Sequence, residues 1–315
     1  MQIAGACRIA QTQRIDQTHN VRVNQMIADD FDASLLQQWV GKTESACDLI
    51  HPGAASALAA TLDRPLAVEQ GVALPPLWHW IYFWSVSPQA GIGADGHPQR
   101  GGFLPPVSLP RRMWAGGRLT FGAPLPIGAT ATRTSRIQNV TAKNGQSGKL
   151  AFVTVQHQIT HNDRIAITEE HDIVYRDLPQ PGSVSAVPKT APDDAVWSRT
   201  VTPDPVLLFR YSALTFNGHR IHYDRSYVTE VEGYPGLIVH GPLIATLLVD
   251  LLQRHMPQAQ LSAFNFRAVG PLFDIEPFTV CGQPDADGRT VRLWAKNARG
   301  ELAMQAEATL ADPTN

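Results

Sequence analysis

The feature that most constrains the fold is a run of alternating apolar and polar residues between residues 111 and 175. Alternation with a period of two is typical of half-buried β-strands, because successive side chains point to opposite faces of a sheet. Turn residues interrupt the run, and Asn144-Gly145 is a strong hairpin signal. The run therefore predicts four antiparallel strands, at 118–121, 130–140, 148–160 and 164–175.

The same order of elements occurs twice along the chain. In each half a short helix is predicted to begin at a proline, Pro52 or Pro205, since proline favours the first helical position. A loop, a helix of apolar residues and a group of alternating strands then follow. The apolar helices are predicted at 74–84 and 242–255, and the second group of strands at 261–269, 278–283, 290–297 and 302–310. An amphipathic helix at 30–40 and a brief strand at 48–50 are predicted before the first unit.

This long-period duplication predicts an α+β fold of the kind called a double hotdog. In such a fold two antiparallel sheets join edge to edge, and each sheet wraps around its own central helix and hides it from water. The length of 315 residues suits two domains of about 150 residues each. The predicted division is an N-terminal extension at 1–26, a first hotdog at 27–177, a Pro- and Ser-rich linker at 178–195 and a second hotdog at 196–315.

Composition and charge exclude several classes of function. A hydrophobic fraction of 43% supports a packed core, and a net charge of −2 provides no basic surface for nucleic acid. The apolar runs are far shorter than a membrane span. Three cysteines are scattered without metal or redox spacing, which suits a reducing compartment. We therefore expect a cytoplasmic protein that binds neither nucleic acid nor membrane. Because a double hotdog already forms an internal pseudo-dimer, a monomer or a homodimer is expected.

Polar residues concentrate in one loop of the second half, just before its apolar helix. This loop holds Asn217, His219, Arg220, His222 and Asp224. The corresponding loop of the first half, 63–74, contains no histidine. One active site per chain is therefore expected, on the second half. The first hotdog would be degenerate and non-catalytic, and it would supply a wall of the pocket through the segment 91–106.

The sequence His240-Gly241-Pro242 marks the start of the second apolar helix. Proline at a first helical position has a preset φ, and its missing N–H would have been unpaired there. The backbone N–H of Gly241 is expected at the amino end of this helix, where it can stabilise a developing oxyanion. Glycine also allows a reacting carbonyl to approach closely.

Residues 210–252 resemble the MaoC-like, R-specific enoyl-CoA hydratases, and the resemblance extends over roughly 27–310. The family motif is an Asp, one residue, then Asn-Pro-Leu/Ile-His, and further on Ala-His-Gly-Met. Ile221-His222 matches the end of the first part, and Val239-His240-Gly241-Pro242 matches the second. The sequence of residues 212–224 more closely resembles one branch of this family, which contains the mesaconyl-C4-CoA hydratases, the itaconyl-CoA hydratases and the mitochondrial 3-hydroxyacyl-thioester dehydratase. The motif's Asp falls on Asn217, and its Asn-Pro is replaced by His219-Arg220.

The resemblance implies reversible addition of water to an α,β-unsaturated acyl-CoA, with mesaconyl-C4-CoA to citramalyl-CoA as the specific case. His222 is predicted as the general base, since the pKa of histidine lies near the working pH. Gly241 is predicted as the oxyanion donor, and Asn217 as the group that orients the water. Because an amide cannot share the acid–base work, either His222 makes both proton transfers, or Asp224 or Glu232 takes the place of the missing Asp.

Further substrate contacts are predicted from His219, Arg220, Asp224, Tyr234, His240 and Arg267. No metal and no redox cofactor is expected, and coenzyme A enters as part of the substrate. The aromatic residues of 78–84 are expected in the core, with a wall of the acyl pocket as the alternative. A 3-hydroxyacyl-thioester dehydratase of fatty acid synthesis and a non-catalytic acyl-CoA-binding protein remain alternative functions. A long apolar tunnel would favour the dehydratase, and a short pocket closed by Arg or His would favour a dicarboxylic substrate.

Overall fold

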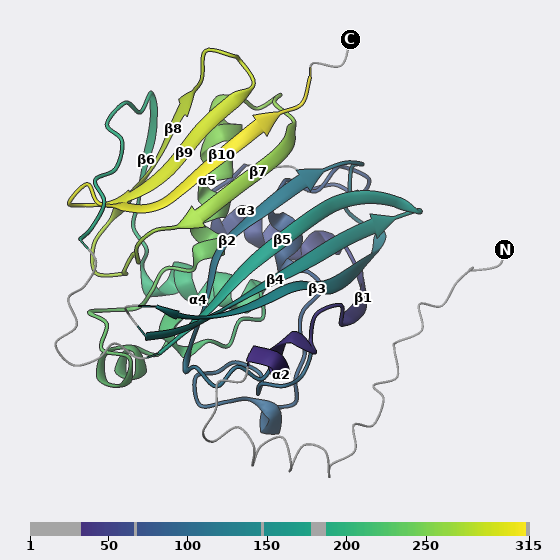
Figure 1. Cartoon of the computed structure of the whole chain (residues 1–315). Coiled ribbons are helices and arrows are strands. Elements are labelled where there is room, and N and C mark those ends of the chain that lie inside the picture. Colours follow the sequence, from purple (N-terminus) through teal and green to yellow (C-terminus); the bar gives the residue numbers. More distant parts are fainter. Residues whose placement is uncertain (1–32, 66–67, 146–147, 178–186, 313–315) are drawn as a thin grey trace.

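Within residues 33–65, 68–145, 148–177 and 187–312, which the computed structural model describes, ten antiparallel strands form one sheet (Figure 1). Their order across the sheet is β1-β3-β4-β5-β2-β7-β10-β9-β8-β6. The strands are β1 (Thr43–Leu49), β2 (Arg111–Phe121), β3 (Thr130–Gly145), β4 (Gly148–His161), β5 (Arg164–Arg176), β6 (Trp197–Val201), β7 (Leu261–Ala268), β8 (Phe278–Pro284), β9 (Thr290–Asn297) and β10 (Leu302–Leu310).

The two halves of the chain meet where β2 of the first half pairs with β7 of the second. Two glycines of β2 allow close contact at this seam. A Cβ atom on Gly116 would lie 2.6 Å from the carbonyl oxygen of Phe266, and one on Gly117 would lie 2.9 Å from the Phe266 ring. The expected edge-to-edge junction of two antiparallel sheets is therefore confirmed, and with it the sheet arrangement of a double hotdog.

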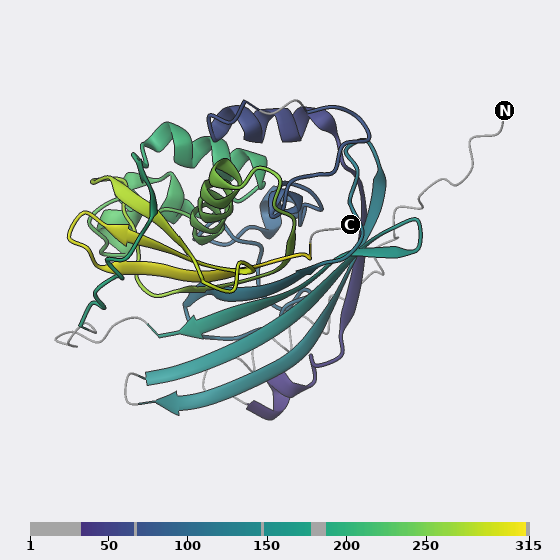
Figure 2. The ribbon, with the colours of Figure 1, turned by 90° about the horizontal axis from the view of Figure 1, so that it is seen from above.

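Three helices, α3 (Pro52–Thr61), α4 (Pro205–Leu214) and α5 (Gly241–His255), lie along one face of the curved sheet, and the short α2 (Ala33–Gln37) lies on the other side (Figure 2). The central one is α5, in which every residue from Leu243 to Leu252 is buried. It packs against β8, β9 and β10, and α3 packs against α4. Asp250 is the one acid in the buried run of α5, and it forms ion pairs with Arg64, Arg199 and Arg254. Since Arg64 comes from the first half, this carboxylate also ties the two halves together.

The prediction of an apolar helix at 74–84 is wrong. This segment is an irregular loop with a single 3₁₀ turn, Trp78–Ile81, and Leu77 and Phe83 adopt the left-handed backbone region with φ of 69° and 55°. Asp48 accepts a hydrogen bond from the Phe83 N–H, which satisfies a backbone donor that a helix would have paired internally. The apolar character of the segment reflects burial between the two halves. The described part of the first half therefore has no long central helix of its own.

Most other predicted elements match the structure, with shifted ends. The four strands of each predicted group are present, as are the helices that begin at Pro52 and Pro205. The first helix is the short α2 (Ala33–Gln37), and the predicted strand at 48–50 lies at the end of the longer β1. β6 was not predicted. The predicted extension 1–26, the first residues of the helix expected at 30–40 and residues 178–186 of the predicted linker fall outside the described residues.

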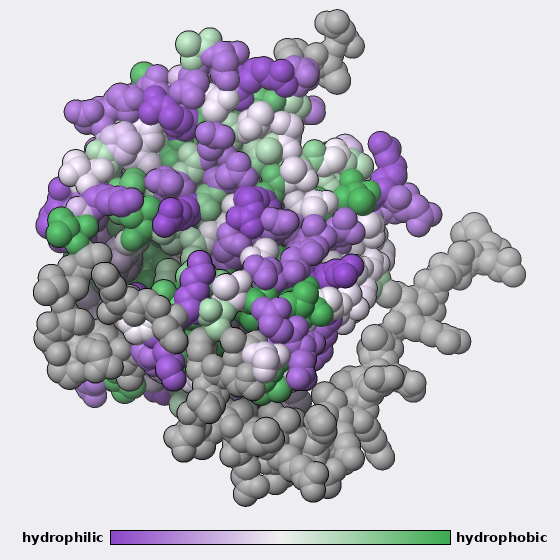
Figure 3. All heavy atoms as spheres, viewed as in Figure 1, coloured by the Kyte–Doolittle hydropathy of each residue, from purple (hydrophilic) through white to green (hydrophobic). Residues whose placement is uncertain are grey.

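Hydrophilic side chains cover much of the face in Figure 3, and hydrophobic ones form small groups among them. No helix in the described part of the chain is long and apolar enough to cross a membrane.

Candidate active site

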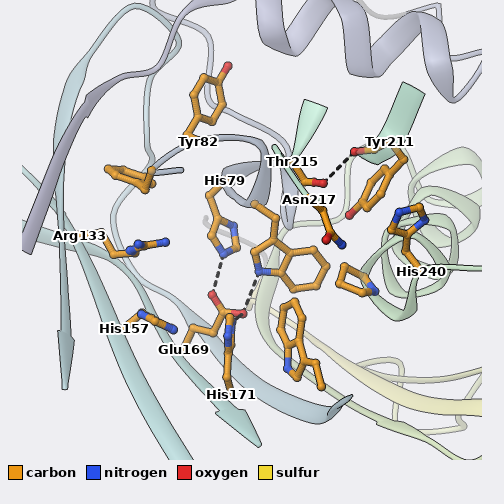
Figure 4. A pocket seen from close by; sticks show the side chains of 14 residues that line it. His79, Tyr82, Arg133, His157, Glu169, His171, Tyr211, Thr215, Asn217 and His240 are labelled. Atoms are coloured by element: carbon orange, nitrogen blue, oxygen red, sulfur yellow. Dashed lines mark hydrogen bonds and ion pairs between the residues drawn. The ribbon is translucent and has the colours of Figure 1, made fainter. Parts of the chain in front are cut away.

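A cavity of about 220 Å³ lies between the two halves of the chain (Figure 4). Its lining residues from the second half are Tyr211, Thr215, Asn217, His240 and Pro242. Its lining residues from the first half are His79, Trp80, Tyr82, Phe83, Trp114, Arg133, His157, Glu169 and His171. The expectation that the first half supplies a wall is confirmed, but the wall is built from β2–β5 and the loop around the 3₁₀ turn, and not from 91–106.

The amino end of α5 forms one end of the cavity. His240 is the N-cap residue of α5, and its Nε2 lies 2.8 Å from Ser212 Oγ. Burial holds the pKa of His240 well below its usual value, so the ring is neutral. Gly241 is the first helical residue, and its N–H therefore has no carbonyl one turn earlier to bond. A Cβ atom on Gly241 would meet nothing closer than Trp114 O, at 4.0 Å, so there is open space beside this residue.

His222 lies directly behind His240. The two rings are stacked with centroids 3.7 Å apart, which places the predicted base close to the start of α5. Nδ1 of His222 is 2.7 Å from the carbonyl oxygen of Ile238, so Nδ1 carries the proton and donates, and Nε2 keeps a free lone pair. Burial lowers the pKa of His222 to about 4, against the opposing effect of this hydrogen bond. The ring is therefore a neutral base at physiological pH, although His240, and not His222, lines the cavity itself.

Asn217 lines the cavity, as a residue that orients water must. Its Oδ1 accepts a hydrogen bond of 3.0 Å from the His219 N–H, which fixes the orientation of the amide. The Nδ2 amino group is thus left as a donor for an oxygen atom in the cavity. Asn217 can hold a water or a substrate oxygen there, but it cannot take a proton.

The other residues of the motif loop mainly fasten it to the first half. Arg220 Nη2 pairs with Asp224 Oδ2 at 2.7 Å, and Arg220 Nη1 donates to the carbonyl oxygen of Ala94. The ring of His219 lies 4.0 Å from that of His97. None of Arg220, Asp224 and His219 lines the cavity, so the segment 91–106 supports the motif loop instead of forming the pocket wall.

Two further predicted substrate contacts lie away from the cavity. Tyr234 packs beneath the guanidinium of Arg111, whose carbon is 5.0 Å from the ring centroid. Arg267 is exposed on β7, on the face of the sheet opposite the buried Phe266. Glu232, considered as a substitute for the missing Asp, pairs with Arg111 at 3.1 Å. Neither it nor Asp224 reaches the cavity, so these substitutions are not supported.

A possible metal-ligand set lies outside the cavity. One ligand atom each from Asp95, His97 and His219 falls within 4.8 Å of the others. Asp95 already uses both oxygens on His97, since Oδ2 lies 2.9 Å from the ring Nδ1 and Oδ1 accepts the backbone N–H. These contacts explain the cluster as a support of the loop.

The buried acid of the cavity is Glu169 on β5, a residue that no motif in the sequence predicted. Its Oε2 lies 2.9 Å from His79 Nε2, and its Oε1 lies 2.6 Å from His171 Nε2 and 2.8 Å from Trp80 Nε1. Burial alone would raise the pKa of Glu169, but the imidazoles of His171 and His79 hold it well below its usual value. Glu169 is thus an ionised carboxylate surrounded by N–H donors.

Strand alternation contained a signal for this wall. Arg133, His157, Glu169 and His171 share the parity of apolar residues that face the core, such as Ile159 and Ile167. Charged and imidazole side chains at core-facing positions need partners or a ligand. The same holds for His79, a buried histidine inside an aromatic segment.

Comparison with known proteins gives consistent matches. Residues 77–274 match the family model described as "Hydroxyacyl-thioester dehydratase type 2". The chain is 49% identical to a mesaconyl-C(4)-CoA hydratase from Chloroflexus aurantiacus, over 86% of this chain and 96% of that protein. It is 29% identical to the mitochondrial hydroxyacyl-thioester dehydratase type 2 of Schizosaccharomyces pombe, over 66% of this chain and 77% of that protein.

Solved structures agree on the fold. A MaoC-like dehydratase from Phytophthora capsici superposes with a TM-score of 0.65 at 14% identity, covering 90% of this chain and all of that one. A Mycobacterium tuberculosis protein described as a double hotdog superposes with a TM-score of 0.55 at 13% identity, covering 86% of this chain and 96% of that one.

Proposed function

Because the chain belongs to the hydroxyacyl-thioester dehydratase type 2 family, we propose that it hydrates an enoyl-CoA, and specifically mesaconyl-C4-CoA to citramalyl-CoA. The observation that supports this substrate is the 49% identity to a mesaconyl-C(4)-CoA hydratase over nearly the whole of that protein. Mesaconyl-C4-CoA is a short branched thioester with a free carboxylate on its β-carbon. We expect the protein to act on it as a monomer or homodimer in the cytoplasm.

The cavity supports a short, charged acyl group. It measures about 220 Å³, and the wall opposite the start of α5 carries Arg133, His157 and Glu169. A growing fatty acyl chain would need a longer apolar tunnel, because desolvating a guanidinium against alkyl groups is unfavourable. The Arg and His side chains of this wall favour a dicarboxylic substrate over a long alkyl chain.

The proposed reaction starts with the thioester carbonyl at the amino end of α5. The N–H of Gly241 would stabilise the enolate oxygen as charge develops there. A water held by Asn217 adds its hydroxyl to the β-carbon and gives a proton to Nε2 of His222. The resulting imidazolium then returns a proton to the α-carbon, which regenerates the neutral ring. One histidine thus makes both transfers, as the absence of an acid at position 217 requires.

The test is an assay of the purified protein with mesaconyl-C4-CoA, itaconyl-CoA and crotonyl-CoA. Loss of the enoyl-thioester absorbance reports hydration, and chiral analysis identifies the product. We expect the highest kcat/KM with mesaconyl-C4-CoA and formation of a single citramalyl-CoA enantiomer. A clear preference for crotonyl-CoA, or binding without any absorbance change, would contradict the proposal.

A second candidate is dehydration of 3-hydroxyacyl thioesters in fatty acid synthesis. The observation in its favour is the 29% identity to the mitochondrial enzyme of Schizosaccharomyces pombe. Including 3-hydroxyacyl thioesters of increasing chain length in the same assay distinguishes the two, because a cavity of this size should reject the longer ones.

A further inference from the structure

Arg133 is a half-buried cation that feels the charges of Glu44, Glu169 and Asp48 but forms no ion pair with any of them. It extends from β3 into the cavity (Figure 4), and its guanidinium carbon lies 5.7 Å from the centre of the Phe83 ring. Its Nε is inaccessible to solvent and has no hydrogen-bond partner. Among the described residues no carboxylate lies within ion-pair distance of Arg133. Because a desolvated charge is unfavourable unless it is paired, such an arginine indicates an anion that comes from outside the chain.

Glu169, the one acid that lines the cavity, does not meet this need. Its two oxygens accept hydrogen bonds from the rings of His79, His171 and Trp80, at 2.6–2.9 Å. Three N–H donors leave it well satisfied. The Glu169 carboxylate instead fixes the imidazoles of the wall, while the guanidinium of Arg133 remains available to a ligand.

His157 provides a second donor beside Arg133. Its Nδ1 lies 2.9 Å from Ser135 Oγ, and its ring centre is 4.4 Å from that of His171. Burial holds the pKa of His157 well below its usual value, so the ring is neutral and carries one proton. When the Ser135 hydroxyl donates to Nδ1, that proton is on Nε2, which has no partner among the described residues. A guanidinium and an imidazole N–H together match the two oxygens of a carboxylate.

We propose that Arg133 and His157 form the binding site for the free carboxylate of the substrate and so select monothioesters of dicarboxylic acids. This inference rests on the proposed function, which places the thioester carbonyl at Gly241. In mesaconyl-C4-CoA the carboxylate is attached to the β-carbon, and it would point from the start of α5 toward the opposite wall. An enoyl-CoA with a methyl group at that position would leave the guanidinium unpaired.

Binding of two unreactive ligands tests the site without relying on catalysis. Succinyl-CoA and butyryl-CoA differ in having a carboxylate or a methyl group at the end of the same chain. We expect calorimetry to show at least tenfold tighter binding of succinyl-CoA to the wild type, and nearly equal binding of the two ligands to Arg133→Met. Arg136→Met is the matched control, since Arg136 is exposed on the same strand and should leave the preference intact. A preference that survives in Arg133→Met overturns the proposal.

Kinetics provide the second measurement. In 3-methylcrotonyl-CoA a methyl group replaces the carboxylate of mesaconyl-C4-CoA. We expect Arg133→Met to lower the ratio of kcat/KM for mesaconyl-C4-CoA over 3-methylcrotonyl-CoA by about 100-fold, the effect of losing a charge-assisted pair. Arg133→Lys keeps the charge, and its intermediate preference would show that a Met variant has lost recognition and not its fold. If the wild type hydrates no mesaconyl-C4-CoA but still prefers succinyl-CoA, the proposed function fails and the carboxylate site stands.

Discussion

Replacement of Glu169 by glutamine tests whether the polar wall of the cavity is a structural unit. The side chain is 2% exposed, and its carboxylate accepts three N–H donors, two on Oε1 and one on Oε2. In Glu169→Gln the amide oxygen can keep the donors from His171 and Trp80, but the new NH₂ faces His79 Nε2. His79 must then move its proton to Nδ1, which is buried without a partner.

The magnitude follows from these contacts. A hydrogen bond to a charged group contributes about 1.5–3 kcal/mol, and breaking a buried ion pair costs about 3–5 kcal/mol. Since the amide keeps two of the three contacts without their charge, we expect a loss of about 3 kcal/mol in the free energy of unfolding. Urea denaturation followed by tryptophan fluorescence measures it, because Trp80 and Trp114 both line the cavity.

Glu170→Gln is the matched control for this experiment. Glu170 is the next residue of β5, and it pairs at 2.8 Å with Arg118, whose side chain is 48% exposed and also binds Asp172. Exposed ion pairs contribute about 0–1 kcal/mol, so this variant should remain close to the wild type. Equal stabilities of the Glu169 and Glu170 variants would refute the view that the buried wall is held together by its carboxylate.

Three other predictions concern the base and the motif loop. His222→Ala should lower kcat by at least 100-fold, the usual contribution of a general base, while circular dichroism shows an intact fold; near wild-type turnover would reject His222 as the base. Because burial lowers the pKa of His222 to about 4, kcat/KM should stay constant as the pH falls below the ordinary histidine value of about 6.5 and should decline only near pH 4, where the base becomes protonated. A decline centred near pH 6.5 would point to an exposed histidine instead. Gly96→Ala should destabilise the protein by about 3 kcal/mol or more, since Gly96 has a φ of +88° and a Cβ atom there would lie 1.8 Å from Gly218 O. The control is Gly71→Ala, at a residue with a φ of +87° and open space around it, which should cost only about 1 kcal/mol. Equal losses of stability in the two variants would show that the contact between Gly96 and the motif loop is unimportant.

Sequence periodicity predicted best the elements that have a regular backbone and are buried either on one face or completely. Strand β4 was predicted because its buried positions alternate from Ala151 to Ile159, and β3 and β5 were predicted from apolar–polar alternation in the sequence. α5 was predicted because a proline and a glycine mark its start and ten buried residues follow. Both signals are local, so a single sequence contains them.

The failure at 74–84 has a physical cause. An apolar run shows that a segment is buried, but it does not say whether the backbone is helical. Here the backbone is set by contacts with distant residues, since Tyr82 Oη donates to His51 O and the Phe83 N–H donates to Asp48. Such tertiary hydrogen bonds leave no periodic trace in the segment itself.

The candidate site was predicted only for the half that carries a continuous motif. Asn217, His240 and the start of α5 lie within 26 residues of one another in the sequence, and the structure brings them to one end of the cavity. Arg133, His157 and Glu169 come from three strands, and only the register of those strands places them side by side. The sequence therefore predicts a degenerate first half, although this half supplies most of the cavity lining.

We infer that the departure at position 217 is related to the wall that faces it. A carboxylate there would join Glu169 as a second buried acid in a cavity that we propose receives a substrate carboxylate, and like charges in a poorly solvated space repel one another strongly. Asn217 keeps the acceptor that binds the His219 N–H and a donor for water, without adding a charge. On our proposal, the amide in the second half and Arg133 in the first half both suit an anionic acyl group. In the proposed mechanism the loss of the acid leaves the proton transfers to His222, whose hydrogen bond to Ile238 keeps Nε2 unprotonated.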